Sequence, residues 1–265
     1  MDLINCNGIS IHYRWINSNK DKTFVLINSL GTDFRIWDDV AKALQPYGNI
    51  LRFDKRGHGL SDVVIDTRGL DDYVMDALTL LEKLAIRKCI VIGLSIGGMI
   101  AQVMSHKTNG LIEKLILCDT RFKIGTRQMW DERIDAVNKS GLSSISNAVM
   151  QRWFSEDFRN SEPYRVAGYR NMLERTPAVG YIRACEAIRD ADLSEVAKQI
   201  RIPALCVVGS EDKSTTPEEV KSLSDLITGS RYEVIDRSAH IPCVDNPAAL
   251  NKLIIDFISH ENYGQ

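Results

Sequence analysis

Apolar residues in this chain form short continuous runs that alternate with amphipathic stretches. Runs of roughly four to eight residues rich in β-branched side chains are typical of strands buried on both faces of a parallel sheet. They lie at residues 23–28, 50–53, 88–92, 114–118, 204–208 and 232–235. Apolar residues recur at helical spacing over 34–47, 70–85, 99–104, 217–227 and 247–259. Two further strand patterns, 3–7 and 10–16, are joined by Asn7-Gly8, a strong hairpin signal.

The alternation stops between residues 121 and 198, where only helical periodicity is present, in pieces at 127–139, 144–154, 162–175 and 178–190. The later strands are needed to cover the edge of the earlier sheet, so a helical insertion explains the pattern better than two consecutive domains. We therefore expect an α/β fold with a mostly parallel eight-stranded sheet and helices on both faces. Residues 1–120 and 199–265 would form the core, and 121–198 a helical cap.

Composition narrows the class of protein. The 265 residues are 44% hydrophobic, enough for one large core, and the formal charge of −2 offers no basic surface for nucleic acid. The first residues lack a basic segment followed by an apolar one, and no run approaches the roughly 18 apolar residues that span a membrane. Six scattered cysteines without a CxxC pair fit a reducing compartment. We expect a cytoplasmic protein without membrane or nucleic-acid partners.

The segment 93–98, Gly-Leu-Ser-Ile-Gly-Gly, lies between a predicted buried strand and a predicted helix. A Gly-x-Ser-x-Gly turn in this context is the pattern of a nucleophile elbow, in which the serine has a strained backbone that only glycine neighbours accommodate. The alternative is a glycine-rich turn with an incidental serine. We predict that Ser95 is a nucleophile.

A serine hydroxyl needs a nearby base to become nucleophilic, and a third group to orient that base. Histidines elsewhere lie in the first hairpin, an early glycine loop or near helix ends (His12, His58, His106 and His260). His240 follows a predicted strand and comes last in the chain, as the elbow order of Ser, acid and His requires. We therefore predict that His240 is the base, against the alternative of a solvated loop histidine.

The acid should lie between Ser95 and His240 at the end of a strand. Asp212 follows the strand at 204–208 and is the preferred candidate, with Glu211 as its neighbour and rival. Asp119 ends the strand after the elbow and is a geometrically possible alternative, because it opens onto the same edge of the sheet. Any one of the three could instead be an ordinary acidic loop residue.

Attack on an ester or lactone creates an oxyanion, which requires preformed hydrogen-bond donors. The backbone N–H groups of Ile96, at the start of the elbow helix, and of Leu30, in the turn after the strand at 23–28, are placed to supply them. Asn28 and Ser29 occupy positions where lipase-like sequences often have His-Gly. This departure leaves the backbone donors available.

The whole chain resembles the α/β-hydrolases, through the elbow, GSED (209–212), SAHIP (238–242) and the loop DKRGHGLSD (54–62). Within that superfamily, NSLGTDFRIWD (28–38), FDKRGHGLSD (53–62), IGTRQMWDERIDAV (124–137) and RWF (152–154) resemble 3-oxoadipate enol-lactonases of the β-ketoadipate pathway of aromatic compound degradation. The first two motifs are shared among carboxylic ester hydrolases, so the cap stretches carry most of the specificity. The resemblance implies an α/β-hydrolase fold and hydrolysis of a small enol-lactone to 3-oxoadipate, with no metal or organic cofactor.

A small, flat, anionic lactone calls for apolar walls and a cation aimed at its carboxylate. Trp130 and Arg133 would share one helix face, with Arg127 one turn earlier, and Arg152 and Trp153 recur in the next predicted helix. We expect Trp130 or Trp153 to line the ring, and Arg133 or Arg127 to receive the carboxylate. The alternative is that these are packing residues and solvated arginines.

Other functions remain open from the sequence. A general carboxylesterase, a cofactor-free haloperoxidase or another small-molecule hydrolase would use the same triad, whereas Ser95 argues against relatives with an aspartate nucleophile. A ligand receptor could keep the triad as a binding pocket without significant turnover. The oligomeric state is also open, because an apolar cap surface serves equally as pocket wall or subunit interface.

Overall fold

The computed structural model describes residues 1–259. Residues 260–265, which end the expected core segment and include His260, lie outside the described part. The strands form one sheet in the order β1-β2-β4-β3-β5-β6-β7-β8. Their bounds are β1 (Asp2–Cys6), β2 (Ile9–Ile16), β3 (Thr23–Ile27), β4 (Asn49–Phe53), β5 (Cys89–Leu94), β6 (Ile112–Cys118), β7 (Ala204–Gly209) and β8 (Arg231–Ile235).

The sheet is antiparallel only at its β1–β2–β4 end and parallel from β4 to β8. Every residue of β3, β4, β5 and β7 is buried, as their continuous apolar runs predict. The predicted eight-stranded, mostly parallel sheet is confirmed. Because its parallel strands end at one edge, the loops that follow β3, β4, β5, β6, β7 and β8 are brought together there.

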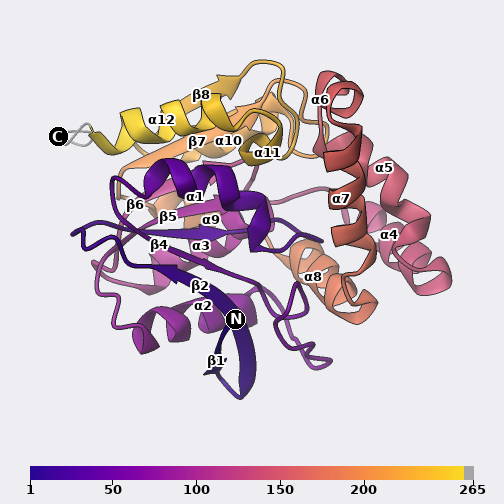
Figure 1. The fold of residues 1–265 in the computed structure, drawn as a ribbon, viewed down its shortest axis with the longest axis horizontal. Coiled ribbons are helices and arrows are strands. Elements are labelled where there is room, and N and C mark those ends of the chain that lie inside the picture. The colour runs from indigo at the N-terminus through magenta and orange to yellow at the C-terminus, as the bar shows by residue number, and fades with distance from the viewer. Residues whose placement is uncertain (260–265) are drawn as a thin grey trace.

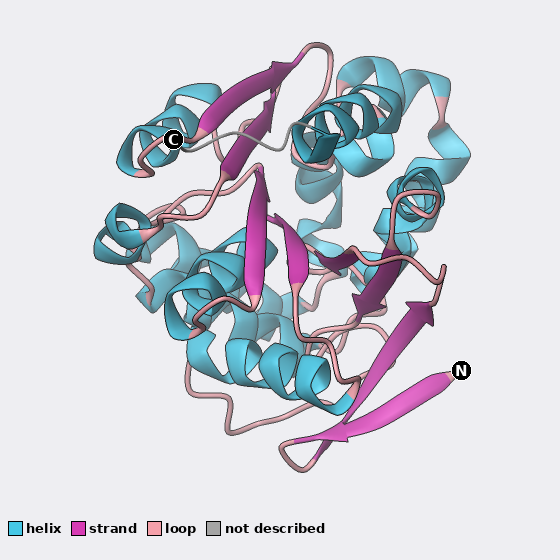
Figure 2. Ribbon diagram, turned by 90° about the vertical axis from the view of Figure 1, so that its left-hand side faces the viewer, coloured by secondary structure: helices cyan, strands magenta, loops and turns pink. Residues whose placement is uncertain are grey.

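Helices cover both sides of the sheet (Figure 2). One layer contains α1 (Asp38–Leu44) and α12 (Pro247–Ser259), which pack against each other. The other contains α2 (Leu70–Lys83), α3 (Ile96–Lys107), α9 (Ser194–Gln199) and α10 (Pro217–Leu226). The predicted helix at 34–47 is divided into a 3-10 turn, η1 (Phe34–Trp37), and α1. No helix within residues 1–259 combines the length and apolarity needed to span a bilayer.

Five of the six helices between β6 and β7 gather at one side of the sheet, on the right in Figure 1. They are α4 (Arg127–Ser140), α5 (Ser143–Trp153), α6 (Glu156–Ser161), α7 (Pro163–Glu174) and α8 (Ala178–Asp190). Four coincide with the predicted helical stretches, whereas α6 is too short to show periodicity. The division into core and cap remains our proposal, and α9 spans its second boundary while packing on α3 and α10 of the core.

Candidate active site

The elbow serine has the backbone conformation that its motif predicts. Ser95 stands between β5 and α3 with φ 56° and ψ −120°, a positive φ that is uncommon outside glycine. A Cβ on Gly93 would overlap the carbonyl of Gly97, and one on Gly97 would overlap the carbonyl of Ile27. The two glycines therefore let the strand, the turn and the helix approach one another closely enough to hold Ser95 in this strained position.

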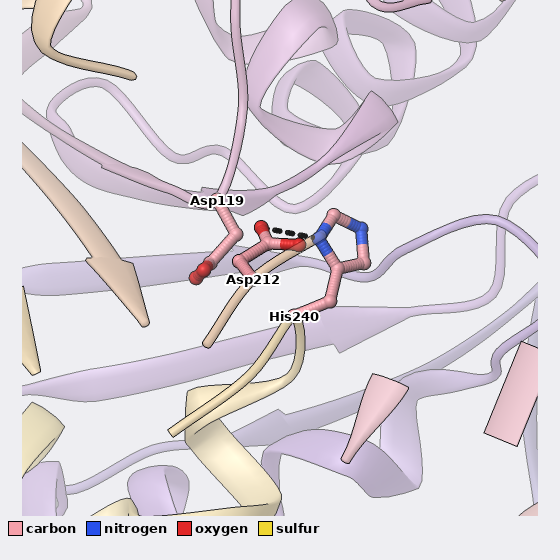
Figure 3. Close-up of side chains that lie close together, drawn as sticks. All are labelled: Asp119, Asp212 and His240. Carbon is pink, nitrogen blue, oxygen red and sulfur yellow. Dashed lines mark hydrogen bonds and ion pairs between the residues drawn. The ribbon is translucent and has the colours of Figure 1, made fainter. Parts of the chain in front are cut away.

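His240 and Asp212 form a buried pair at the same edge of the sheet. Asp212 follows β7, and His240 lies in the loop between β8 and α11 (Pro242–Asp245). Nδ1 of His240 lies 2.8 Å from Oδ2 of Asp212, and the two side chains face each other in Figure 3. An imidazole held through Nδ1 leaves Nε2 free to exchange a proton.

Asp212 is held as an anion by its own loop. Oδ1 accepts hydrogen bonds from the backbone N–H groups of Ser214 (2.7 Å) and Thr215 (3.2 Å), and Oδ2 accepts one from the Thr215 hydroxyl (2.7 Å). Burial alone would raise the pKa of Asp212, but the charge of His240 and these hydrogen bonds outweigh it and lower the pKa below its usual value. The carboxylate is thus suited to orient an imidazole and to stabilise its positive charge.

Asp119 is the second carboxyl group of the cluster, directly after β6 (Figure 3). Its Oδ1 accepts a hydrogen bond from the N–H of Gly209 (2.9 Å), while its buried Oδ2 has no hydrogen-bond partner within residues 1–259. Burial and the negative charge of Asp212 raise the pKa of Asp119 well above its usual value. The rival Glu211 is exposed to solvent. The pairing with His240 therefore favours Asp212 as the triad acid.

The same cluster has a set of side chains that could hold a metal ion. Ligand atoms of Asp119, Asp212 and His240 lie within 4.8 Å of one another, the one such group of His, Cys, Asp or Glu in the described chain. Hydrogen bonds from His240, Ser214 and Thr215 already occupy the oxygens of Asp212. The expectation of a metal-free, cofactor-free site stays a prediction.

Two backbone N–H groups are available as oxyanion donors. Ile96 is the first residue of α3, whose initial N–H groups have no intrahelical acceptor, and Leu30 lies in the turn after β3. Neither N–H donates to any acceptor in the described residues. Leu30 and Ser95 line one cavity, so the predicted donor and the predicted nucleophile meet there.

This cavity has a volume of about 120 Å³ and lies between the sheet edge and the cap. Its walls come from the core (Ser29, Leu30, Ser95, Lys213, Ser214 and His240) and from the cap (Ile124, Met129, Trp130, Arg133, Val149, Arg152, Trp153 and Tyr181). The volume suits a small ligand, and the two tryptophans and the aliphatic side chains make much of the wall apolar.

Two guanidinium groups line this cavity, and neither has a carboxylate partner within residues 1–259. Arg133 packs its guanidinium 4.9 Å from the centre of the Trp130 ring, and Arg152 on α5 lines the same cavity. Burial and the nearby positive charge of Arg133 lower the pKa of Arg152. No ion pair to either arginine forms within residues 1–259. An anionic ligand would relieve their mutual repulsion.

The structure separates the four cap residues singled out from the sequence. Trp130, Arg133 and Trp153 line the cavity, whereas Arg127 is exposed and pairs with Asp190 of α8 at 2.6 Å. Arg152 lines the cavity in its place. The feature of the sequence that could have indicated this is its position next to Trp153. Tyr181 and Lys213 also line the wall. No spacing in the sequence links these two residues to the elbow.

Comparisons with known proteins agree with this geometry. The family model described as Serine aminopeptidase, S33, matches residues 18–246. The chain is 32% identical over 234 residues to 3-oxoadipate enol-lactonase 1 of Acinetobacter baylyi, covering 88% of this chain and 87% of that protein. It is 29% identical over 253 residues to 3-oxoadipate enol-lactonase 2 of the same organism, covering 96% and 94%.

A solved structure gives the same result. The crystal structure of the enol-lactonase from Burkholderia xenovorans LB400 superimposes with a TM-score of 0.95 at 32% identity, covering 98% of this chain and 100% of that one. The predicted fold and resemblance are confirmed. The chain belongs to the α/β-hydrolase family described as Serine aminopeptidase, S33, and is a hydrolase.

Proposed function

We propose that this hydrolase opens the ring of 3-oxoadipate enol-lactone to give 3-oxoadipate, through an acyl-enzyme on Ser95. The observation that carries the proposal is the pair of guanidinium groups, Arg133 and Arg152, in the same small cavity as Ser95 and His240. A neutral ester gives these cations nothing to bind, whereas a carboxylated lactone does. The similarity to proteins named as enol-lactonases supports the same substrate.

In the proposed mechanism, Nε2 of His240 accepts the proton of the Ser95 hydroxyl as its oxygen attacks the lactone carbonyl. Asp212 holds the ring through Nδ1 and stabilises the positive charge that forms. The N–H groups of Leu30 and Ile96 bind the oxyanion, which is worth about 100 to 1,000-fold in rate for each donor. The ring oxygen leaves as an enol and becomes the ketone, and water then releases the acid from Ser95.

The cap would supply the substrate specificity. Trp130 and Trp153 are proposed to lie against the flat ring, and Arg133 and Arg152 to receive the carboxylate. Arg127, the other cation considered from the sequence, is engaged by Asp190 outside the cavity. The proposal therefore places the acyl chemistry on the core and the choice of an anionic substrate on the cap.

The test is a spectrophotometric assay of enol-lactone loss beside a panel of neutral esters of similar size. We expect kcat/KM for the lactone to exceed that for the neutral esters by at least about tenfold, the usual contribution of one charged hydrogen bond. A preference for neutral esters would instead indicate a general carboxylesterase. If no ester is turned over and no acyl-enzyme burst is seen, the result would instead indicate a ligand receptor.

A further inference from the structure

A lysine is buried directly beneath the turn that carries the Leu30 N–H. Lys55 follows β4 and is only 2% exposed. Ile27 at the end of β3 is paired in register with Phe53 at the end of β4, so the two following loops leave the sheet side by side. Nζ of Lys55 donates to the carbonyl of Ser29 at 2.9 Å and to that of Asn28 at 3.1 Å.

The carbonyl of Ser29 and the N–H of Leu30 are two ends of one peptide group. In a trans peptide they point in opposite directions, so fixing the carbonyl also fixes the direction of the N–H. The Thr32 hydroxyl donates to the same carbonyl at 2.9 Å, which closes the turn behind it. The carbonyl end is thus anchored on the core side, while Leu30 lines the cavity and its N–H has no acceptor in the described residues.

We propose that Lys55 is a positioning residue of the oxyanion hole. Its ammonium donates a hydrogen bond to the Ser29 carbonyl, and thereby orients the Leu30 N–H toward the oxyanion and polarises it. The inference rests on the proposed function, because it takes that N–H to be an oxyanion donor. Lys55 itself does not line the cavity and contacts no reacting atom.

The energetics of the site favour this role over simple packing. Burial lowers the pKa of Lys55 to about 7, and the negative charges of Asp54 and Asp33 offset this only in part. No carboxylate within residues 1–259 forms an ion pair with Nζ. An apolar side chain of the same length would fill the space without the cost of desolvating an amino group. What the lysine adds is a charge-assisted hydrogen bond to a carbonyl, stronger than a neutral donor would make.

The same charge acts on its surroundings. Burial and the positive charge of Lys55 lower the pKa of His58 well below its usual range, which keeps that buried ring neutral. His58 Nδ1 bonds the carbonyl of Arg56 at 3.2 Å. The neutral His58 ring therefore adds no charge beside the turn at Ser29 and Leu30, toward which Lys55 directs its ammonium.

The test compares Lys55→Met, which keeps an unbranched side chain of nearly the same length and removes its donors, with the wild-type enzyme at one pH below 7. Three quantities are measured: kcat and KM for the enol-lactone, the affinity of a small boronic acid that forms a tetrahedral adduct with Ser95, and the affinity of 3-oxoadipate. We expect kcat and boronate affinity to fall together by about 10 to 100-fold. This is less than the loss of rate when an oxyanion donor is removed altogether, because the Leu30 N–H is still present. KM and 3-oxoadipate affinity should stay within about twofold, because the ground state does not use the oxyanion hole.

Two further variants support the interpretation. Lys55→Arg keeps a charged donor and should recover part of the lost kcat. Lys22→Met is the control for loss of a lysine elsewhere, because the exposed Lys22 also donates to a backbone carbonyl, that of Ile258, away from the cavity. It should leave kcat unchanged. If Lys55→Met does not fold by circular dichroism, Thr32→Val removes the other side-chain donor to the same carbonyl and should lower kcat and boronate affinity together by a few-fold.

The outcomes separate this inference from the proposed function. Wild-type protein without lactone turnover or a boronate adduct contradicts the function itself. Active wild-type enzyme with unchanged kcat and boronate affinity in the Lys55→Met variant, or in Thr32→Val where Lys55→Met does not fold, overturns the role of Lys55. A parallel loss of 3-oxoadipate affinity also overturns it, because the whole cavity would then have been disturbed.

Discussion

The two halves of the cavity are held in place by different interactions. On the core side, Ser95, Asp212 and His240 lie in loops that follow strands. Backbone strain fixes the position of Ser95, and buried hydrogen bonds fix those of Asp212 and His240. On the cap side, Trp130 and Arg133 lie on α4, where the Trp130 indole donates to the carbonyl of Ile124 at 2.7 Å and its ring packs against the Arg133 guanidinium, which has no carboxylate partner within residues 1–259. The core side therefore has its hydrogen bonds in place without a ligand, whereas in the proposed function the cap arginine gains its partner from the substrate.

The two halves are joined where the loop that carries His240, between β8 and α11, contacts the cap. The N–H of Ile241 donates to the carbonyl of Trp153 at 3.1 Å. Asp245 accepts from the N–H of Ala239 at 2.9 Å and from the N–H of Ser155, at the start of α6, at 3.2 Å. These bonds hold the loop of His240 against the cap. Even so, changes on the core side should act mainly on kcat and changes on the cap side mainly on KM.

The largest effect is expected for Ser95→Ala. Removal of the nucleophile should lower kcat for the lactone on the order of a million-fold. Binding of 3-oxoadipate, measured by calorimetry, should change little because the cap cations remain. Circular dichroism should match that of the wild type. Residual activity within about tenfold of the wild type would place the nucleophile elsewhere and remove the distinction between the two halves.

Next in size is the comparison of two isosteric changes, Asp212→Asn and Asp119→Asn. The first should lower kcat about 10,000-fold, because an amide in place of the carboxylate favours the wrong imidazole tautomer. The second should lower it by less than about tenfold, because Asp119 lies beside Asp212 as a neutral acid rather than against the ring. Single-turnover kinetics of the lactone measure both. The reverse order would make Asp119 the working acid.

On the cap side, Arg133→Met and Arg152→Met should each raise KM for the anionic lactone by about 10 to 100-fold, as expected for loss of a charged hydrogen bond. The effect on a neutral ester should stay below about threefold. Arg127→Met is the matched control, since it removes an arginine of α4 that is paired outside the cavity. An equal rise in KM for neutral and anionic substrates would show that the arginines support the cap rather than bind the carboxylate.

The placement of the two halves follows from the sequence to different extents. The strands follow from continuous apolar runs, and Ser95 and His240 from chain order at strand ends, because local pattern and sheet topology determine both. Asp119 and Asp212 both end strands, so only the pairing with His240 in three dimensions separates them. On α4, helical spacing puts Arg127 and Arg133 each one turn from Trp130. It does not show that Asp190, distant in sequence, pairs with Arg127.

Short elements and long-range contacts account for most of what the sequence does not show. Helices α6 and α11 have six and four residues, less than two turns, and give no periodic signal. Lys55 lies in a glycine-rich loop that resembles those of many hydrolases. Only the register of β3 against β4 shows that it reaches the oxyanion turn.

The smallest effect concerns the free energy of unfolding and tests whether Asp119, beside Asp212 and His240, is protonated in the folded protein. The raised pKa of Asp119 means that the folded protein keeps a proton which the unfolded chain releases above about pH 4, the usual range of an aspartate. The folded state then binds more protons than the unfolded state, so this carboxyl group lowers the free energy of unfolding as the pH rises. Asp119→Asn removes that loss. Its free energy of unfolding relative to wild type should increase by up to about 1.4 kcal/mol per pH unit above pH 4.

Urea unfolding at pH 5, 6 and 7 measures this difference, with Glu211→Gln, an exposed neighbour of Asp212, as the control expected to show no such slope. Asp212 contributes the opposite sign, since its lowered pKa gives stability that is present above its unfolded pKa and is lost as the pH falls through its folded pKa. The two carboxyl groups are therefore distinguishable although they are neighbours. A flat difference for Asp119→Asn would mean that Asp119 is ionised in the folded protein. Two negative charges would then face His240, and the assignment of a single triad acid on the core side would have to be abandoned.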